Sequence, residues 1–159
     1  MRKRLIGGAE HDASLADQDQ DWLNLELVEE VEITSEDAGH PIESALLPPG
    51  GVGWRAAEAG RQTIRLLFTP PQRLQRIRLE FAESTIERTQ EYLLRWSSDG
   101  GQSFREIVRQ QWNFSPHGAT YETEDYRVDL LDVAILELII TPDTNGKLAF
   151  ASLARLRLT

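Results

Sequence analysis

The sequence predicts an all-β protein, an antiparallel β-sandwich of the jelly-roll type with about eight strands. Three observations lead to this fold class. Short apolar runs alternate with polar residues at a period of two, as in strands with one buried face. Clusters of Pro, Gly, Asn and Asp separate these runs and are typical of turns. No segment shows a convincing helical period, and many short strands without intervening helices favour a sandwich.

The clearest strand is the segment from Gln75 to Phe81, where apolar side chains at positions 77, 79 and 81 alternate with charged ones at 76, 78 and 80. The same alternation marks seven other segments: 28–33, 62–68, 91–97, 104–110, 126–130, 134–141 and 150–158. Asp99-Gly100 is the strongest hairpin signal, because a tight turn needs left-handed backbone conformations that Asp and Gly tolerate. It lies within a Ser-x-Asp-x-Gly-x-x-aromatic pattern, in which we expect Asp99 to cap the turn and Phe104 to pack behind it.

Length and composition fit a single domain, with 159 residues, 40% hydrophobic residues and no cysteine. A chain of this size can fold without a covalent staple, and the lack of cysteine excludes disulfides, thiolate zinc sites and cysteine nucleophiles. Residues 7–21 combine few apolar side chains with many acids, a composition that does not repay the entropy of ordering. We therefore expect residues 1–21 to form an acidic, mobile N-terminal arm and residues 22–159 to form one β-sandwich domain.

The charges are distributed unevenly. Residues 5–54 hold 12 acidic side chains and no Lys or Arg, whereas residues 55–159 hold 14 acidic and 14 basic ones, and the net charge is −9. An isoelectric point near 4.8 argues against a nucleic-acid binder, which would display a basic face. The apolar run behind Arg2-Lys3-Arg4 is too short for a signal peptide, and no apolar window reaches the length of a membrane span. We expect a cytoplasmic protein without nucleic-acid or membrane partners.

A series of short motifs runs from about Val31 to Leu158. It begins with Ile33-Thr34-Ser35 and His40-Pro41-Ile42-Glu43-Ser44-Ala45, continues with Gly53-Trp54-Arg55-Ala56 and the strands 62–66 and 74–81, and ends with the 92–104 hairpin and 151–158. In this order, the motifs resemble the discoidin or coagulation-factor C-type domains, the galactose-binding-domain-like family. The resemblance implies a jelly-roll sandwich whose loops at one end bind ligands. Its members include carbohydrate-binding, lipid-binding and protein-interaction domains, so the fold leaves the function open.

Many carbohydrate-binding members of that family hold a structural calcium, with an Asp in an Asp-Gly step ahead of the Trp and a late Glu near the carboxyl end. Here the segment 48–53 ahead of Trp54 reads Pro-Pro-Gly-Gly-Val-Gly, and Arg155 stands where the late Glu is expected. Calcium needs several oxygen ligands, and Glu43 is the one carboxylate nearby. We therefore expect no metal site of the family type and no cofactor.

The segment from Gln111 to Tyr121 is the longest irregular stretch inside the expected sandwich, and it carries three aromatic side chains, an amide and a histidine. Loops on a rigid scaffold often carry recognition residues. Trp112 is a candidate for stacking on a sugar ring, and Asn113 and His117 are candidates for hydrogen bonds to its hydroxyls. In the alternative interpretation, Trp112 closes the end of the core and His117 only stabilises the turn.

Three further residues are candidates for the same site. On a Gly-rich turn, Trp54 and Arg55 can combine a stacking surface with a bidentate clamp for a carboxylate or phosphate, and Arg88 can reach the same end. In the alternative, Trp54 is buried in the core, Arg55 pairs with the acidic N-terminal third, and Arg88 lies on a solvated loop tip. The sequence alone leaves both interpretations open.

The sequence shows no catalytic constellation. Its three histidines, His11, His40 and His117, have neither i, i+4 spacing nor an HExxH context, which excludes a helical zinc site. It holds no GxSxG elbow, phosphate-binding loop or dinucleotide fingerprint, and the acids at 122–125 do not identify a converging catalytic pair. We therefore expect a protein that is not an enzyme.

Two function classes follow. The first is a non-catalytic recognition domain of discoidin-like type, which binds a carbohydrate or similar polar ligand through the six candidate residues at one end of the sandwich. The second is an intracellular protein-interaction or assembly subunit. Such a subunit would use either the acidic arm or an arginine-bearing strand face made of Arg65, Arg76, Arg78, Glu80 and Arg95. The oligomeric state is left open.

Overall fold

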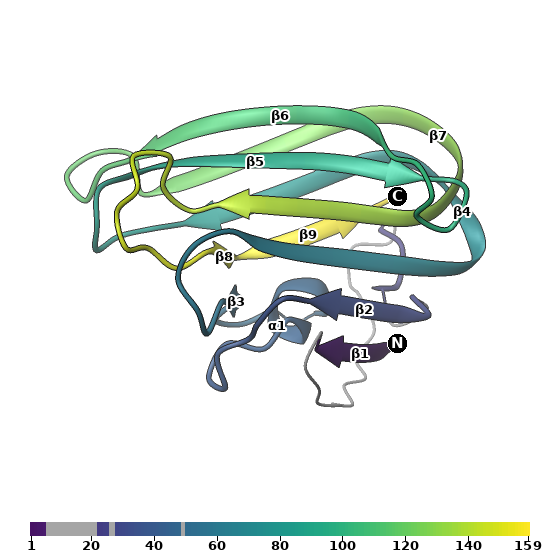
Figure 1. The fold of residues 1–159 in the computed structure, drawn as a ribbon, viewed down its shortest axis with the longest axis horizontal. Coiled ribbons are helices and arrows are strands. Elements are labelled where there is room, and N and C mark those ends of the chain that lie inside the picture. Colours follow the sequence, from purple (N-terminus) through teal and green to yellow (C-terminus); the bar gives the residue numbers. More distant parts are fainter. Residues whose placement is uncertain (6–21, 26–27, 49) are drawn as a thin grey trace.

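Two long strands, β4 (Gln62–Ala82) and β7 (Tyr121–Thr141), organise the fold in the computed structural model, which describes residues 1–5, 22–25, 28–48 and 50–159. The first half of β4 pairs with β2 (Glu30–Ile33) and with the end of β7. Its second half pairs with β9 (Arg155–Leu158) and with the start of β7. Both strands therefore take part in both layers of a sandwich, and their ribbons curve together at the right of Figure 1.

The larger layer, in the described part of the chain, has the strand order β1 (Arg2–Leu5), β2, β4, β7, β5 (Arg88–Ser97) and β6 (Arg105–Phe114). The smaller layer contains β9 and the portions of β4 and β7 that pair with it or beside it. The strands run antiparallel, except that β1 and β2 are parallel. A short helix, α1 (Glu43–Leu46), and the pair β3 (Trp54–Arg55) and β8 (Ser152–Leu153) lie below β5 and β6 and above β1 in Figure 1.

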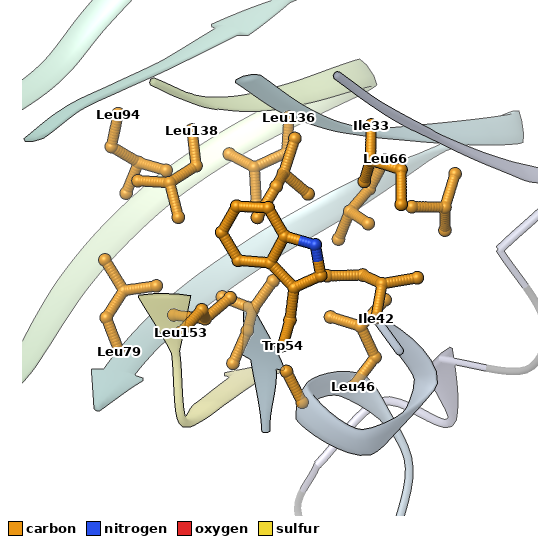
Figure 2. Packing of buried hydrophobic residues seen from close by; sticks show 14 of the residues in the cluster. Ile33, Ile42, Leu46, Trp54, Leu66, Leu79, Leu94, Leu136, Leu138 and Leu153 are labelled. Carbon is orange, nitrogen blue, oxygen red and sulfur yellow. The ribbon is translucent and has the colours of Figure 1, made fainter. Parts of the chain in front are cut away.

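The hydrophobic core lies between the layers, because the alternating apolar side chains of each strand point inward. Leu66 and Leu136 from the larger layer and Leu79 from the smaller layer surround the Trp54 indole in Figure 2. The rings of Phe81 and Tyr92 stack with their centroids 5.1 Å apart and join the layers directly. Burial of these large side chains stabilises the sandwich.

Most of the alternating segments predicted from the sequence are strands, and the fold class is confirmed. The prediction differs at three places. Segments 62–68 and 75–81 are one continuous strand, as are 126–130 and 134–141, whereas 150–158 is divided into β8 and β9, which pair with different strands. Pro70 and Pro71 do not interrupt β4, because the fixed φ of proline is compatible with an extended backbone. Register shifts between Leu67 and Gln72 let the strand bend without ending.

The expectation of a mobile arm at residues 1–21 is wrong for Arg2–Leu5, which form the edge strand β1 of the larger layer. The physical reason is the Lys3 side chain. Its ammonium lies 2.7 Å from a Glu43 carboxylate oxygen and 3.0 Å from one of Glu36, and it is buried. The rest of the proposed arm, residues 6–21, lies outside the described residues.

Candidate functional site

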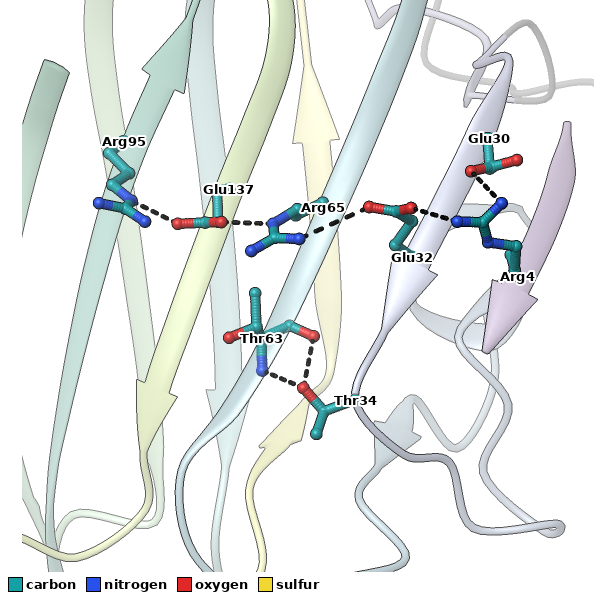
Figure 3. Close-up of polar contacts among 8 residues, drawn as sticks. All are labelled: Arg4, Glu30, Glu32, Thr34, Thr63, Arg65, Arg95 and Glu137. Atoms are coloured by element: carbon teal, nitrogen blue, oxygen red, sulfur yellow. Dashed lines mark hydrogen bonds and ion pairs between the residues drawn. The ribbon is translucent and has the colours of Figure 1, made fainter. Parts of the chain in front are cut away.

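A row of alternating charges crosses the outer face of the larger layer, one residue per strand (Figure 3). Arg4 lies opposite Glu32 across β1 and β2, and Glu32 lies opposite Arg65 across β2 and β4. In turn, Glu137 on β7 lies opposite both Arg65 on β4 and Arg95 on β5. Directly opposed charges of unlike sign stabilise a sheet, and we call this set the charged row.

Glu137 is the centre of the charged row and is fully buried, at 0% exposure. One carboxylate oxygen accepts a hydrogen bond from Arg65 Nε at 2.5 Å, and the other accepts one from Arg95 Nε. The bond to Glu137 is also the main reason that the pKa of Arg65 is raised. A buried carboxylate is costly unless it is paired and hydrogen-bonded, and two guanidinium groups meet that requirement here.

Beside the charged row, the outer face of the larger layer is hollowed by about 300 Å³. We call this the hairpin hollow. The residues that line it are Glu32, Arg65, Leu67, Gly100, Gly101, Phe104 and Ile135. It thus combines an aromatic ring and two aliphatic side chains with a charged pair and glycine backbone, and the β5–β6 hairpin forms one of its walls.

The hairpin wall is held by the hydrogen bonds predicted from the Ser-x-Asp pattern, which confirms that part of the sequence analysis. Asp99 Oδ1 accepts from the Ser103 backbone N–H at 2.9 Å and from the Ser97 hydroxyl at 2.7 Å. A hydrogen bond from the Ser103 hydroxyl, together with these two bonds, holds the pKa of Asp99 well below its usual range. Gly101 has φ +95°, and an added Cβ there would lie 3.3 Å from Ile135, so the close wall depends on glycine.

Phe104, the aromatic residue of the hollow, is fixed from one side by Arg95. The guanidinium carbon lies 4.2 Å from the centre of the ring, while Nε of the same group donates to Glu137. A guanidinium above an aromatic face is electrostatically favourable. The charged row therefore positions the aromatic wall as well as the polar wall of the hollow.

The prediction that Trp54 stacks on a ligand is wrong. Its side chain is 1% exposed and lies in the core in Figure 2. The indole Nε1 donates to the backbone carbonyl of Ser35 at 3.1 Å, so its polar atom is also used inside the protein. Trp54 follows the alternative interpretation, because a large aromatic side chain is buried where the fold allows it.

Arg88 is likewise a structural residue rather than a ligand contact. Its guanidinium is buried, with Nε 2.8 Å from a Glu83 carboxylate oxygen and Nη1 2.8 Å from the Pro142 carbonyl oxygen. It also lies 4.9 Å above the Phe114 ring. Partners from two separate loops satisfy the charge, so neither the ligand role nor the solvated loop tip predicted from the sequence is correct.

The expected loop at 111–121 is shorter than predicted and covers residues 115–120, because β6 continues to Phe114 and β7 begins at Tyr121. Trp112 is half-buried and packs against the core beside Gln90. Asn113 is exposed, and its side-chain oxygen accepts a hydrogen bond from the Thr89 hydroxyl at 2.8 Å. His117 is exposed on the turn between the strands. These three positions remain predictions as ligand contacts.

Arg55 is exposed as predicted, and its guanidinium carbon lies 5.3 Å from the centre of the Phe150 ring. Of the six candidates, only Arg55, Asn113 and His117 are therefore well exposed. Within the described residues, no hydrogen bond or ion pair joins Arg55 to either of the other two. The hollow, in contrast, was missed as a site, because its residues come together only through strand pairing.

The predicted arginine-bearing face does not exist as one surface. Arg65 and Arg95 lie on the outer face of the larger layer, whereas Arg76 and Arg78 belong to the part of β4 that pairs with β9 in the smaller layer. Arg76 is moreover paired with Asp125, with Nε 2.8 Å from the carboxylate. Strand β4 changes layer between these positions, and this divides the arginines between two faces. The acidic arm of the same hypothesis lies largely outside the described residues.

The residues present do not fit the calcium ion that the family resemblance implies. The Arg155 guanidinium lies so near Gly50 that a Cβ added there would be 3.1 Å from Nη2. The carboxylate of Glu43 is bound to the Lys3 ammonium. Among the described residues, no group of three or more His, Cys, Asp or Glu is placed to hold a metal. A cationic side chain and a paired carboxylate thus stand where oxygen ligands would be needed.

Solved structures with a similar architecture include carbohydrate-binding modules. One is CpGH89CBM32-5 from Clostridium perfringens in complex with GalNAc-β-1,3-galactose, with a TM-score of 0.58 and 20% identity over 87% of this chain and 99% of that one. Another is the family 32 module of C. perfringens NanJ in complex with galactose, with a TM-score of 0.59 and 16% identity over 86% and 96% of the two chains. A third is chitosan-binding module 1 from a chitosanase/glucanase of Paenibacillus sp. IK-5, with a TM-score of 0.58 and 19% identity over 86% and 98%.

The chain has a β-sandwich fold similar to that of these modules. At these levels of identity the likeness concerns the fold. No family model and no curated protein matches the sequence. In the described part of the chain, no helix has the length and apolar character needed to cross a membrane.

Proposed function

We propose that the protein is a non-catalytic carbohydrate-binding domain and that the hairpin hollow is its sugar site. The observation that carries the proposal is the composition of the hollow, in which the Phe104 ring and aliphatic side chains face the charged pair Glu32 and Arg65. A sugar has an apolar C–H face that packs on aromatic and aliphatic groups, and hydroxyls that need hydrogen-bonding partners. A volume of about 300 Å³ suits one or two sugar rings.

The fold supports the same class of function. The similar solved structures include modules crystallised with GalNAc-β-1,3-galactose and with galactose, and a chitosan-binding module. A fold by itself hosts many functions, so this likeness adds to the argument from the hollow and does not replace it.

The state of the carboxylates favours binding over catalysis. Both oxygens of Glu137 accept from guanidinium groups, and Glu32 is paired with Arg4 and Arg65. A catalytic acid or base needs a carboxyl that is available to exchange a proton with substrate. At the hollow, these carboxylates instead hold the arginines in place.

The test is a titration of the purified protein with a panel of neutral, acidic and amino sugars, followed by NMR or calorimetry. Phe104→Ala is expected to weaken binding at least tenfold. Phe150→Ala is the matched control, because Phe150 also lies under an arginine, Arg55, but at a different place in the fold. Both variants are first checked for a wild-type circular dichroism spectrum.

Two results would contradict the proposal. If no sugar binds, the function is wrong. If Phe150→Ala abolishes binding while Phe104→Ala leaves it unchanged, the site lies near Arg55 rather than in the hollow, as the sequence analysis had predicted for the loops.

A further inference from the structure

We infer that the hairpin hollow selects sugars that carry a carboxylate, that is, uronic acids, over neutral and amino sugars. This inference rests on the proposed function and names its ligand class. It follows from which hydrogen-bonding groups around the hollow are already used within the protein and which are left for a ligand.

Three of the four carboxylate oxygens of Glu32 and Glu137 already accept a hydrogen bond, and the fourth is in an ion pair. Glu137 binds Arg65 with one oxygen and Arg95 with the other, and it is fully buried. Of the two Glu32 oxygens, one lies 3.6 Å from Arg65 Nη1 and the other 3.1 Å from Arg4 Nη2. Each carboxylate oxygen of the charged row near the hollow thus already faces a guanidinium. The protein therefore has little acceptor capacity to offer to the hydroxyls or ammonium group of a ligand.

The donors are only partly used. Arg65 uses Nε and Nη1, and Arg95 uses Nε. Within the described residues, no hydrogen bond is made by Arg65 Nη2 or by either terminal nitrogen of Arg95. The two side chains are 36% and 33% exposed, respectively, whereas Glu137 between them is not exposed at all. The face presents free N–H donors to solvent.

The placement of the charges agrees with the hydrogen-bond balance. Arg65 and Arg95 flank Glu137 near the hollow, whereas Arg4, at the far end of the charged row, is paired with Glu30 and Glu32. Because the anion in the middle is buried and the cations beside it are partly exposed, a ligand meets the positive groups first. A carboxylate accepts two parallel bonds from a guanidinium, and such charge-assisted bonds are about twice as strong as neutral ones.

The same arrangement disfavours an amino sugar. Its ammonium group would meet Arg65 and Arg95 without a free carboxylate to accept its hydrogens. Repulsion between like charges lowers the affinity for a wrong ligand, and here the ammonium group and the guanidinium groups are both positive. A neutral sugar should fall between the two, because its hydroxyls can accept from Arg65 while its ring packs on Phe104.

The experiment compares sugars that differ at one group. The probes are the methyl glycosides of galacturonic acid, galactose and galactosamine, together with those of glucuronic acid, glucose and glucosamine, titrated by NMR against the full chain. We expect the uronic acid to bind at least tenfold more tightly than its neutral partner in one or both series, and the amino sugar to bind most weakly. The preference for the uronic acid should shrink as the salt concentration rises.

Arg65→Gln should weaken binding of the uronic acid far more than binding of the neutral sugar, and so remove the preference for the uronic acid. Arg73→Gln is the control with the same loss of charge, because Arg73 lies on the same strand but pairs with exposed Asp129 away from the hollow. Since Arg65→Gln also disturbs buried Glu137, the ligand series and its salt dependence in the wild-type protein provide a test that needs no substitution.

The outcomes separate this inference from the proposed function. Equal affinity for uronic and neutral sugars, with both lost in Phe104→Ala, overturns the inference and leaves the sugar site in place. Tighter binding of the amino sugar also overturns it. Failure of every sugar to bind overturns the proposed function itself. A uronic acid preference that survives Arg65→Gln places its recognition elsewhere and contradicts the inference.

Discussion

The ammonium group of Lys3 lies 2.7 Å from the carboxylate of Glu43, and both side chains are no more than 5% exposed. The same ammonium lies 3.0 Å from Glu36. This buried ion pair connects the edge strand β1 to helix α1. It explains why a segment rich in basic residues, which has no apolar alternation of its own, is an ordered part of the sandwich.

Lys3→Ala should therefore destabilise the protein by about 3–5 kcal/mol, because it leaves a buried carboxylate without its partner. Urea unfolding measures the change. The double substitution Lys3→Met with Glu43→Leu should recover most of the loss, since it removes both charges. Arg4→Ala is the control, because Arg4 is 60% exposed and a surface pair contributes about 1 kcal/mol at most. A Lys3→Ala variant as stable as Arg4→Ala would contradict the buried pair.

Glu137→Ala should cost about 3 kcal/mol in the free energy of unfolding, because Arg65 and Arg95 would face each other without the anion between them. The same variant should lose sugar binding. In the wild-type protein, Glu137 holds Arg65, which lines the hollow, and Arg95, which lies over the Phe104 ring. Asp129→Ala tests the specificity of the effect. Asp129 also accepts from an arginine but is 68% exposed, so its removal should change stability by less than about 1 kcal/mol. Comparable losses in both variants would argue against a special role of Glu137.

Stability should depend on pH through Glu122, which is 1% exposed. Burial, assisted by the neighbouring carboxyl of Glu124, raises the pKa of Glu122 from 4.5 to about 8. Between these two pH values the unfolded chain releases a proton that the folded chain keeps. The contribution of Glu122 to the free energy of unfolding should therefore be fully present below pH 4.5 and be lost as the pH rises towards 8.

Glu122→Gln should flatten this slope, because glutamine keeps the shape of the protonated acid and does not titrate. Urea midpoints measured at intervals between pH 4.5 and 8 provide the test. Asp129→Asn should keep the wild-type slope. An unchanged slope in Glu122→Gln would show that another group is responsible.

Removal of calcium should leave the protein unaffected. The Arg155 guanidinium lies against Gly50, and the Glu43 carboxylate is bound to Lys3, so the residues do not provide the oxygen ligands of a calcium site. Melting temperatures in calcium and in chelator should agree within error. A ligand at 100 times its dissociation constant would add about 2.7 kcal/mol of stability, which such a comparison detects readily. A clear rise in melting temperature with calcium would contradict this assignment.

The features that sequence reasoning predicted correctly are those set by neighbouring residues. The alternation from Gln75 to Phe81 predicts a strand because successive side chains of a strand point to opposite faces. The Asp99 turn is predictable for a similar reason, since its hydrogen bonds reach only Ser97 and Ser103. Such patterns are complete within a few residues and need no knowledge of the rest of the fold.

The features that it missed depend on distant partners. Arginine is usually exposed, and the burial of Arg88 depends in part on distant partners, the Pro142 carbonyl 54 residues away and the Phe114 ring. Trp54 is compatible with either a ligand platform or a core position until the layers close over it. The ordered strand at Arg2–Leu5 depends on Glu43 in the same way.

The sequence by itself determined the fold class, most of the strand positions and the Asp99 hairpin, because these follow from the local period of the side chains and from turn chemistry. Only the tertiary structure decided which charges meet. Arg65 and Glu137 are 72 residues apart and become neighbours through the pairing of β4 with β7. The hairpin hollow exists because strand register, which is set by packing of the whole core, brings that pair beside Phe104.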